Sequence, residues 1–257
     1  MEQRTPRFTD MRFLKNEILR TLRDFPRDIV ELLTAPYSDG VVTGLDLTVN
    51  AGTIVIAPGI VKHQGRLLLS KERLEVPYLA KGQKQILKII FDEPYEEPDF
   101  VGQKGTISLE SGVECKDNEM ELARFQLEPG AYLRSEYQDL LDFSTGYNTF
   151  NLVHQPYSGY GGVTINPAVL RYFARELCSY HTENAHDLNI CYQVLNHGKS
   201  ISSELLDYYF SMRLKRDIVA VDNPMRHQYL VQILQMAKQE QRHIRHVPAG
   251  GRKLIVD

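Results

Sequence analysis

Hydrophobic and polar residues alternate along the stretch from Gly40 to Ser70, with the two-residue period of half-buried β-strands. Asn50-Ala51-Gly52 and His63-Gln64-Gly65 separate strand-like runs, and each supplies a residue that tolerates a positive φ. The pattern predicts a meander of short antiparallel strands joined by tight turns.

The same period continues further along the chain. We expect strands at Gln85–Asp92, Gly105–Glu110 and Glu119–Leu127, and six to eight strands in all between residues 41 and 127. The acidic and proline-containing stretch Glu93–Gly102 predicts an exposed loop, because proline cannot donate to a central ladder. This number of strands suits a small sandwich or an open barrel.

A helical pattern precedes the strands. Thr9 or Asp10 is a candidate N-cap, and apolar residues recur at helical spacing from Phe13 to Phe25. Pro26 predicts an interruption, followed by a second short helix over Asp28–Leu33. A short amphipathic arm of this kind packs either on its own domain, which is the commoner arrangement, or on a partner.

The middle of the chain has no steady period. Tyr132–Phe143 predicts a short helix, and Ser144–Asn166, rich in Tyr, Gly, Asn and Ser, predicts a connection between domains. Tyr147, Tyr157 and Tyr160 stand near glycines in this connector and are candidate partner-binding residues.

From Asn166 onward the period is helical, and four helices are expected. Asn166-Pro167, Asp187, Ser200 or Ser202, and Asn223-Pro224 are their candidate N-terminal caps. The predicted fold class is therefore α+β: a short helix, an antiparallel β-sandwich or open barrel, and a domain that resembles a four-helix bundle. The predicted regions are a helical arm (1–38), an antiparallel β-domain (39–130), a Tyr/Gly-rich connector (131–165), an α-helical domain (166–247) and a tail (248–257).

Charge and cysteine spacing exclude several classes of protein. The 257 residues have a formal net charge of -3, whereas nucleic-acid-binding domains usually carry a basic excess. Cys115, Cys178 and Cys191 lack paired spacing, so we expect neither a disulfide framework nor a zinc site, and a reducing compartment. No apolar run approaches the roughly 18 residues of a membrane span, so none is expected.

Two fragments imitate a nucleotide hydrolase. His197-Gly198-Lys199-Ser200 ends like a phosphate loop, but Gln193 stands where the motif requires its first glycine. Ile86–Glu93 imitates the strand that holds magnesium, but it precedes the first fragment, the reverse of the usual order. The histidines show no spacing of metal ligands. We therefore predict no catalytic residue, no cofactor and no metal.

The last helix is basic, and its Arg242 and Arg245 are further candidate partner-binding residues. A solvated helix face or an acidic protein neighbour is the expected explanation of these charges. A nucleic-acid-associated accessory protein is the alternative, although acidic residues elsewhere dilute the positive field. A carbohydrate-binding module that uses Tyr157 and Tyr160 is a third hypothesis, from another class.

Four segments carry a resemblance to a known class: GLDLTV, IAPGIVKHQGR, LARFQLEPGAYLR and DFSTGYN, within Val41–Ser70 and Glu121–Asn148. They resemble β-modules of prophage-encoded tail or baseplate proteins of Gram-positive bacteria, over roughly half of the chain. The resemblance implies a structural subunit that docks with other tail or baseplate proteins and performs no catalysis. Such a protein is made in the bacterial cytoplasm and built into a virion or phage-like particle, and it forms homo-oligomers or binds neighbouring structural proteins.

Overall fold

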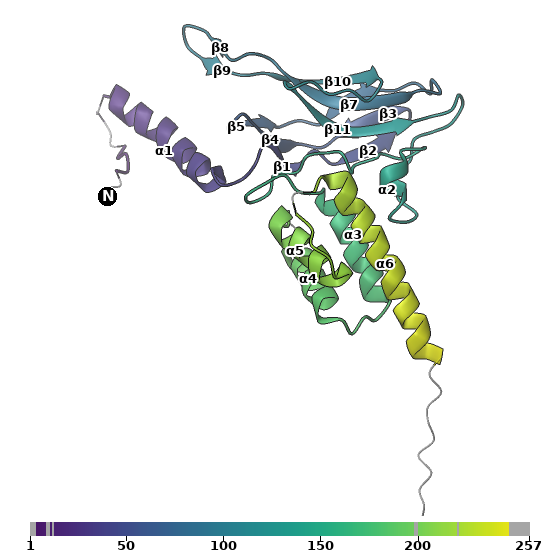
Figure 1. Ribbon diagram of the computed structural model, residues 1–257. Helices are drawn as coiled ribbons and strands as arrows, with labels where there is room; N and C mark the ends of the chain where they lie inside the picture. Colours follow the sequence, from purple (N-terminus) through teal and green to yellow (C-terminus); the bar gives the residue numbers. More distant parts are fainter. Residues whose placement is uncertain (1–3, 9–10, 12, 198–199, 220, 247–257) are drawn as a thin grey trace, which may run out of the picture.

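The computed structural model describes residues 4–8, 11, 13–197, 200–219 and 221–246, with the backbone alone for residues 197 and 242–246 (Figure 1). An N-terminal helix is followed by antiparallel sheets and then by helices, which confirms the predicted α+β fold class. The caps proposed at Thr9 and Asp10, the Gly198-Lys199 fragment and the tail from residue 248 lie outside the described residues.

Eleven strands occur in the described residues, more than the six to eight predicted, because several are only two to four residues long. They are β1 (Gly40–Gly44), β2 (Leu47–Asn50), β3 (Thr53–Ile56), β4 (Gly59–His63), β5 (Arg66–Ser70), β6 (Leu74–Pro77), β7 (Lys84–Phe91), β8 (Tyr95–Glu96), β9 (Val101–Gly102), β10 (Gly105–Ser111) and β11 (Glu119–Gln126).

The strands form small antiparallel sheets in the orders β1-β4-β5, β2-β3-β6, β10-β7-β11 and β8-β9. In Figure 1 the β10-β7-β11 sheet lies across the sheets of β1 to β6. The His63 ring stacks on Phe91 with 3.9 Å between the ring centroids, which joins β4 to β7. Apolar side chains from these sheets, such as Ile54, Leu87 and Leu122, fill one buried core.

Both predicted hairpin turns are present. Ala51 and Gly52 have φ of 44° and 84°, and Gln64 and Gly65 have φ of 48° and 76°. Two consecutive residues with positive φ match the right-handed twist of the flanking strands. Asp39 holds the second turn, because its carboxylate accepts from the backbone N–H groups of Gln64 (2.6 Å) and Gly65 (3.2 Å).

The acidic stretch between β7 and β10 is exposed, as predicted. It is not a plain loop, however, because β8 and β9 pair within it as a two-residue ladder. The register places Tyr95 opposite Gly102. We call residues 92–102 the acidic hairpin.

A buried cation lies in the central strand of the β10-β7-β11 sheet. The Lys88 ammonium donates to Glu119 on β11 at 2.8 Å and lies 2.8 Å from a carboxylate oxygen of Glu110 on β10. The hydrogen bond with Lys88 holds the pKa of Glu119 below its usual value, and the same partner lowers the pKa of Glu110. The three strands are therefore joined at this point by the ion pairs of Lys88 and not by apolar side chains.

We expect Glu119→Gln to lower the free energy of unfolding at pH 7 by about 2 kcal/mol, since a hydrogen bond to a charged group is lost. A carboxyl whose pKa is depressed by folding stabilises the native state above its unfolded pKa, near 4.5 for Glu119. That stabilisation is lost as the pH falls through the folded pKa. Urea denaturation from pH 7 to pH 3 should therefore show the two stability curves converging in acid, and parallel curves would contradict the assignment.

The N-terminal helix α1 (Asn16–Thr34) is continuous, so the predicted interruption at Pro26 and the separate second helix are wrong. Proline removes one backbone N–H and leaves the carbonyl four residues earlier without its partner. No residue of α1 is buried, and water can therefore satisfy that carbonyl without breaking the helix.

Four C-terminal helices are present, as predicted: α3 (Pro167–Ser179), α4 (Ala185–His197), α5 (Ser203–Leu214) and α6 (Asn223–His246). Asn166 caps α3 by accepting from the N–H of Ala168 at 2.7 Å. Ser202 caps α5 by accepting from the N–H of Leu205 at 3.2 Å. Both caps follow the predicted positions.

The other two caps differ from the prediction. Asn184, and not Asp187, accepts from the first turn of α4, at 2.9 Å from the N–H of His186. Asp222, and not Asn223, accepts from the N–H of Met225 at 2.8 Å at the start of α6. In each case the predicted residue has another partner inside the fold.

The helix predicted over Tyr132–Phe143 is absent, and the helix α2 covers only Asp142–Thr145. Tertiary contacts hold this segment in an irregular path. The Tyr137 ring stacks on Phe143 with 3.6 Å between centroids, and Arg134 forms a bridge with Thr149. Residue types that favour a helix locally are therefore overridden by contacts with the following segment.

The connector lies between the strands and the helices and contacts both. Asn151 pairs with Arg124 of β11, and Tyr157 forms bridges with Val41 and Thr164. Phe150 and the apolar residues that flank it belong to the same buried core as the sheets and the helices. The domain boundaries given above stay a prediction.

Candidate functional site

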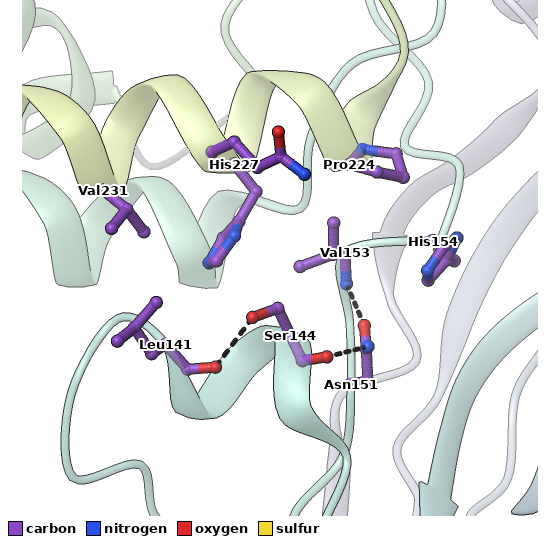
Figure 2. A pocket seen from close by; sticks show the side chains of 9 residues that line it. Leu141, Ser144, Asn151, Val153, His154, Pro224, His227 and Val231 are labelled. Carbon is purple, nitrogen blue, oxygen red and sulfur yellow. Dashed lines mark hydrogen bonds between the residues drawn. The ribbon is translucent and has the colours of Figure 1, made fainter.

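A hollow of about 330 Å³ lies where α2, the connector and α6 meet (Figure 2). Its polar lining includes Ser144, Asn151, His154 and His227. Serine and histidine together are the ingredients of a nucleophilic site, so their hydrogen bonds decide what the hollow can do.

Every hydrogen bond described for these polar side chains is made to the protein's own backbone. The Ser144 hydroxyl donates to the carbonyl of Leu141 at 2.9 Å, pointing along its own helix. Asn151 donates to the carbonyl of Ser144 at 2.7 Å and accepts from the N–H of Val153 at 3.0 Å. In the described part of the chain no hydrogen bond joins Ser144 to a histidine, so the serine has no general base beside it.

The two histidines are neutral near pH 7. Nε2 of His227 donates to the carbonyl of Leu140 at 2.8 Å, and burial lowers the pKa of the ring. Burial also lowers the pKa of His154, and the positive charge of Arg124 lowers it further. Arg124 is itself held by Glu121, at 2.6 Å from its Nε. The hollow is therefore a junction that ties α6 to the connector.

No group of three or more metal-ligating side chains gathers within the described residues. Cys115 and Cys178 are exposed free thiols, and Cys191 is a buried one. None of the described helices is long and apolar enough to cross a bilayer.

The sequence-predicted partner residues do not gather at one place. Tyr147 and Tyr160 are exposed, whereas Tyr157 is only 8% exposed and packs in the core. Burial raises the pKa of Tyr157 to about 12. Arg242 and Arg245 lie in the last turns of α6, and their side chains are outside the described part. A partner-binding role for these residues stays a prediction.

A row of exposed apolar side chains lies on a different surface, the N-terminal helix α1. The residues Ile18, Leu22, Phe25, Ile29 and Leu32 of α1 are spaced by four, three, four and three positions, which places them on one face. Four of these five side chains are exposed, up to 75% for Leu32. In Figure 1 the helix projects away from the sheets and the other helices. We call α1 the arm. The helical spacing in the sequence indicated an apolar face, but it did not show that no other part of the described chain covers this face.

The base of the arm is fixed. The buried ammonium of Lys62 on β4 donates to the carbonyls of Thr34 (2.8 Å) and Tyr37 (2.6 Å), where the helix ends. A cation at this end also complements the helix dipole. Ser38 continues the anchor, because its carbonyl accepts from the hydroxyl of Ser158 at 2.6 Å. The arm therefore leaves the body at a defined place.

We expect Lys62→Met to release the arm from β4, since methionine keeps the apolar stem and removes all three donors. The loss of charge-assisted hydrogen bonds in a buried place should cost about 2 kcal/mol of local stability. Hydrogen exchange should become at least tenfold faster at the amides of residues 35–41 and stay unchanged in α3. Lys81→Met is the matched control, because Lys81 is exposed and its side chain makes no hydrogen bond within the described residues.

Comparisons with known proteins give structural likeness only. No protein-family model matches the chain, and no curated protein sequence is similar to it. One of the structures that it resembles is a crystal structure of TssK (TM-score 0.31, 10% identity). The alignment includes 95% of this chain and 57% of the TssK chain. Others are chains of the type VI secretion system TssK-TssF-TssG baseplate subcomplex (TM-score 0.33, 10% identity) and of the type VI secretion baseplate complex (TM-score 0.31, 12% identity). Each of these covers 91% of this chain and 100% of the other, and TM-scores this low establish neither a common fold nor a common role.

Proposed function

We propose that this chain is a noncatalytic structural protein of a phage or prophage tail or baseplate, or of a related tail-like particle, and that it acts through contacts with other structural proteins. It is made in the bacterial cytoplasm and then built into the particle. The observation that carries the proposal is the arm: an apolar helix face, left uncovered and fixed at its base by Lys62.

The physical reason is the cost of leaving this face in water. Burying an apolar side chain stabilises a structure by about 1.5–3 kcal/mol, and soluble monomers seldom expose contiguous apolar patches. The Phe25 and Ile29 side chains are exposed in the middle of the arm. A partner that covers this face supplies the missing burial, which is what a subunit of an assembly requires.

The hollow around His227 supports the same conclusion. Ser144 and His227 each donate to a backbone carbonyl, and in the described residues no histidine is hydrogen-bonded to Ser144 as a general base. The likeness to baseplate structures is too weak to add support, and the proposal does not depend on it.

The test is co-expression of the full chain with the proteins encoded by its neighbouring genes, followed by purification on this chain. We expect a stoichiometric complex with at least one tail or baseplate protein, lost in Leu22→Glu/Phe25→Glu and kept in Leu195→Glu, which replaces one exposed leucine of α4 by the same acidic residue. Absence of any complex with wild-type protein, or nucleotide hydrolysis abolished by Lys199→Ala, would contradict the proposal.

The nucleic-acid alternative loses two of its basic groups. Arg226 is buried and paired with Asp207 at 2.9 Å, and His227 is buried and neutral. Binding of DNA or RNA that falls steeply with salt and is lost in Arg242→Gln/Arg245→Gln would favour this alternative. A carbohydrate-binding role would now rest on Tyr160 without Tyr157, and binding on a glycan array would favour it.

A further inference from the structure

Two cysteines without a paired sequence motif meet in the helical region. Cys178 lies in the last turn of α3, and Cys191 lies in the middle of α4. The Cys191 thiol donates to the carbonyl of Ala174 at 3.6 Å. In a helix this carbonyl also accepts from the N–H four residues later, which is that of Cys178. The sulfur of Cys191 therefore lies at the turn of α3 that ends with Cys178.

The side chain of Cys178 lies over the same turn. Helical side chains lean toward the N-terminus and cover the turn before their own Cα, and positions four apart share one face. Ala174 is fully buried and has no side chain beyond its Cβ, so it does not separate the two thiols. The Cys178 side chain is a hydrogen-bonding neighbour of the Cys191 thiol. The helices α3 and α4 thus bring two free thiols together.

The two thiols differ in their surroundings. Cys178 is exposed to solvent, whereas Cys191 is buried. Burial raises the pKa of the Cys191 thiol, and the neighbouring Cys178 and the negative charge of Asp187 raise it further. Oxidants react with thiolates, so Cys191 is held in its unreactive protonated form. Cys178 is therefore the group that an oxidant reaches, and Cys191 lies behind it as the second thiol.

We propose that Cys178 and Cys191 form a redox-active thiol pair, which hydrogen peroxide closes into a disulfide between α3 and α4. The Cys178 thiolate attacks one oxygen of the peroxide, the O–O bond breaks, and Cys178 becomes a sulfenic acid while the other oxygen leaves as water. The Cys191 sulfur then attacks the sulfur of the sulfenic acid, and its proton leaves with the departing hydroxide as a second water. In total the two thiols lose two protons and two electrons, and the peroxide takes them up.

The disulfide would enclose the turn between α3 and α4. This turn carries Thr182, whose hydroxyl donates to the buried carboxylate of Asp187 at 3.0 Å. A cross-link here reduces the freedom of the unfolded chain, which stabilises the folded helices. The thiols stay reduced in a reducing compartment and close when the protein meets the oxidant. The inference goes beyond the proposed function and does not depend on it.

Peptide mapping of the full-length protein tests the pair. The protein is treated with hydrogen peroxide in its native state, its remaining thiols are alkylated, and it is then denatured and cut without reduction. A protease specific for glutamate cuts at Glu183, between the two cysteines, so the disulfide appears as two linked peptides. We expect this link in wild type and in Cys115→Ser, and none in Cys178→Ser. No link in wild type, or Cys178 linked mainly to Cys115 or to a second chain, would overturn the proposal.

The order of the two steps gives a second test. In Cys191→Ala the sulfenic acid of Cys178 has no thiol to react with, so dimedone should trap it at least about tenfold more than in wild type. Cys178→Ser should give no dimedone adduct at Cys191, because that thiol is buried and protonated. Near-native circular dichroism of each variant shows that the fold is intact. Equal trapping in Cys191→Ala and wild type, or an adduct at Cys191 in Cys178→Ser, would contradict the proposed order.

Thermal unfolding shows whether the folded helices already hold the two thiols in position for the bond. The disulfide closes a loop of about 15 residues, and for a chain of this size the oxidised protein should melt about 5–10 °C above the reduced one. Cys178→Ser treated in the same way should show no such shift. An oxidised wild type that melts below the reduced protein would contradict a preformed pair. None of these measurements involves a partner, so a missing disulfide would overturn the thiol pair alone, and a missing complex would overturn the proposed function alone.

Discussion

Asp187→Asn should destabilise the protein more than any other single substitution considered for the helical region, by about 3–5 kcal/mol, since it breaks a buried ion pair from one side. Asp187 is fully buried, and one carboxylate oxygen accepts from Tyr209 at 2.9 Å and from Arg213 at 3.1 Å. The other accepts from the hydroxyl of Thr182 at 3.0 Å. Side chains of α5 and of the loop between α3 and α4 therefore converge on one carboxylate of α4.

The asparagine would leave Arg213 largely buried with less charge opposite it. Its remaining anionic partner is Glu240, 2.6 Å from Nη2 and near the protein surface. Tyr209 would keep an acceptor, since the amide oxygen can replace one carboxylate oxygen; burial raises the pKa of this hydroxyl, which stays a donor. The loss thus falls mainly on the uncompensated guanidinium.

Urea denaturation at pH 7 measures this loss, with Glu240→Gln as the matched control. Removing the outer carboxylate should cost less than about 1 kcal/mol, because exposed ion pairs contribute little. Asp187→Asn/Arg213→Met should recover part of the stability lost in Asp187→Asn, because no unpaired charge then remains buried. If Asp187→Asn costs no more than Glu240→Gln, the pair does not hold the helices together.

Asp187 also shows why the sequence misplaced a helix cap. An acidic residue near the start of an apolar helical pattern is a good candidate for the N-cap, and nothing local distinguishes it from Asn184 three positions earlier. The difference comes from Arg213, 26 residues away. Asn223 repeats the case, since its side chain donates to the carbonyl of Thr164 at 2.9 Å and Asp222 takes the cap. Long-range polar partners decided both positions.

The spacing of hydrophobic residues and the residue types at turns were sufficient to predict the fold class, the hairpins and the four C-terminal helices, because these features depend on residues that are close in sequence. The arm illustrates the limit. Its helical spacing was visible in the sequence. The continuity of α1 through Pro26, however, depends on the helix having no buried residue, which only the tertiary structure shows. A groove between β5 and β10 is lined by residues as far apart in sequence as Leu45 and Ile107, so no local pattern could reveal it.

Gly59→Ala should cost about 3 kcal/mol, at the upper end of what overpacking usually costs, since the added methyl group would meet backbone atoms. A Cβ at Gly59 would lie 2.6 Å from the amide nitrogen of Leu45 and 2.6 Å from the carbonyl oxygen of Thr43. Gly44 is its partner in the β1-β4 register and has a φ of +70°, so this edge of the sheet requires two glycines in contact. β1 and β4 would have to separate to admit the methyl group.

Gly162→Ala is the control, because its Cβ would meet only the hydroxyl of Ser203 at 3.0 Å, and this flexible group can rotate away. We expect Gly162→Ala to stay within about 1 kcal/mol of wild type in urea denaturation, the usual range for substitutions away from special features. Equal losses in the two variants would show that β1 and β4 yield easily. The Pro58-Gly59 pair belongs to IAPGIVKHQGR, one of the segments that resemble tail proteins. If the loss is as large as expected, the glycine is required by the packing of β1 against β4, and its presence carries no information about a partner.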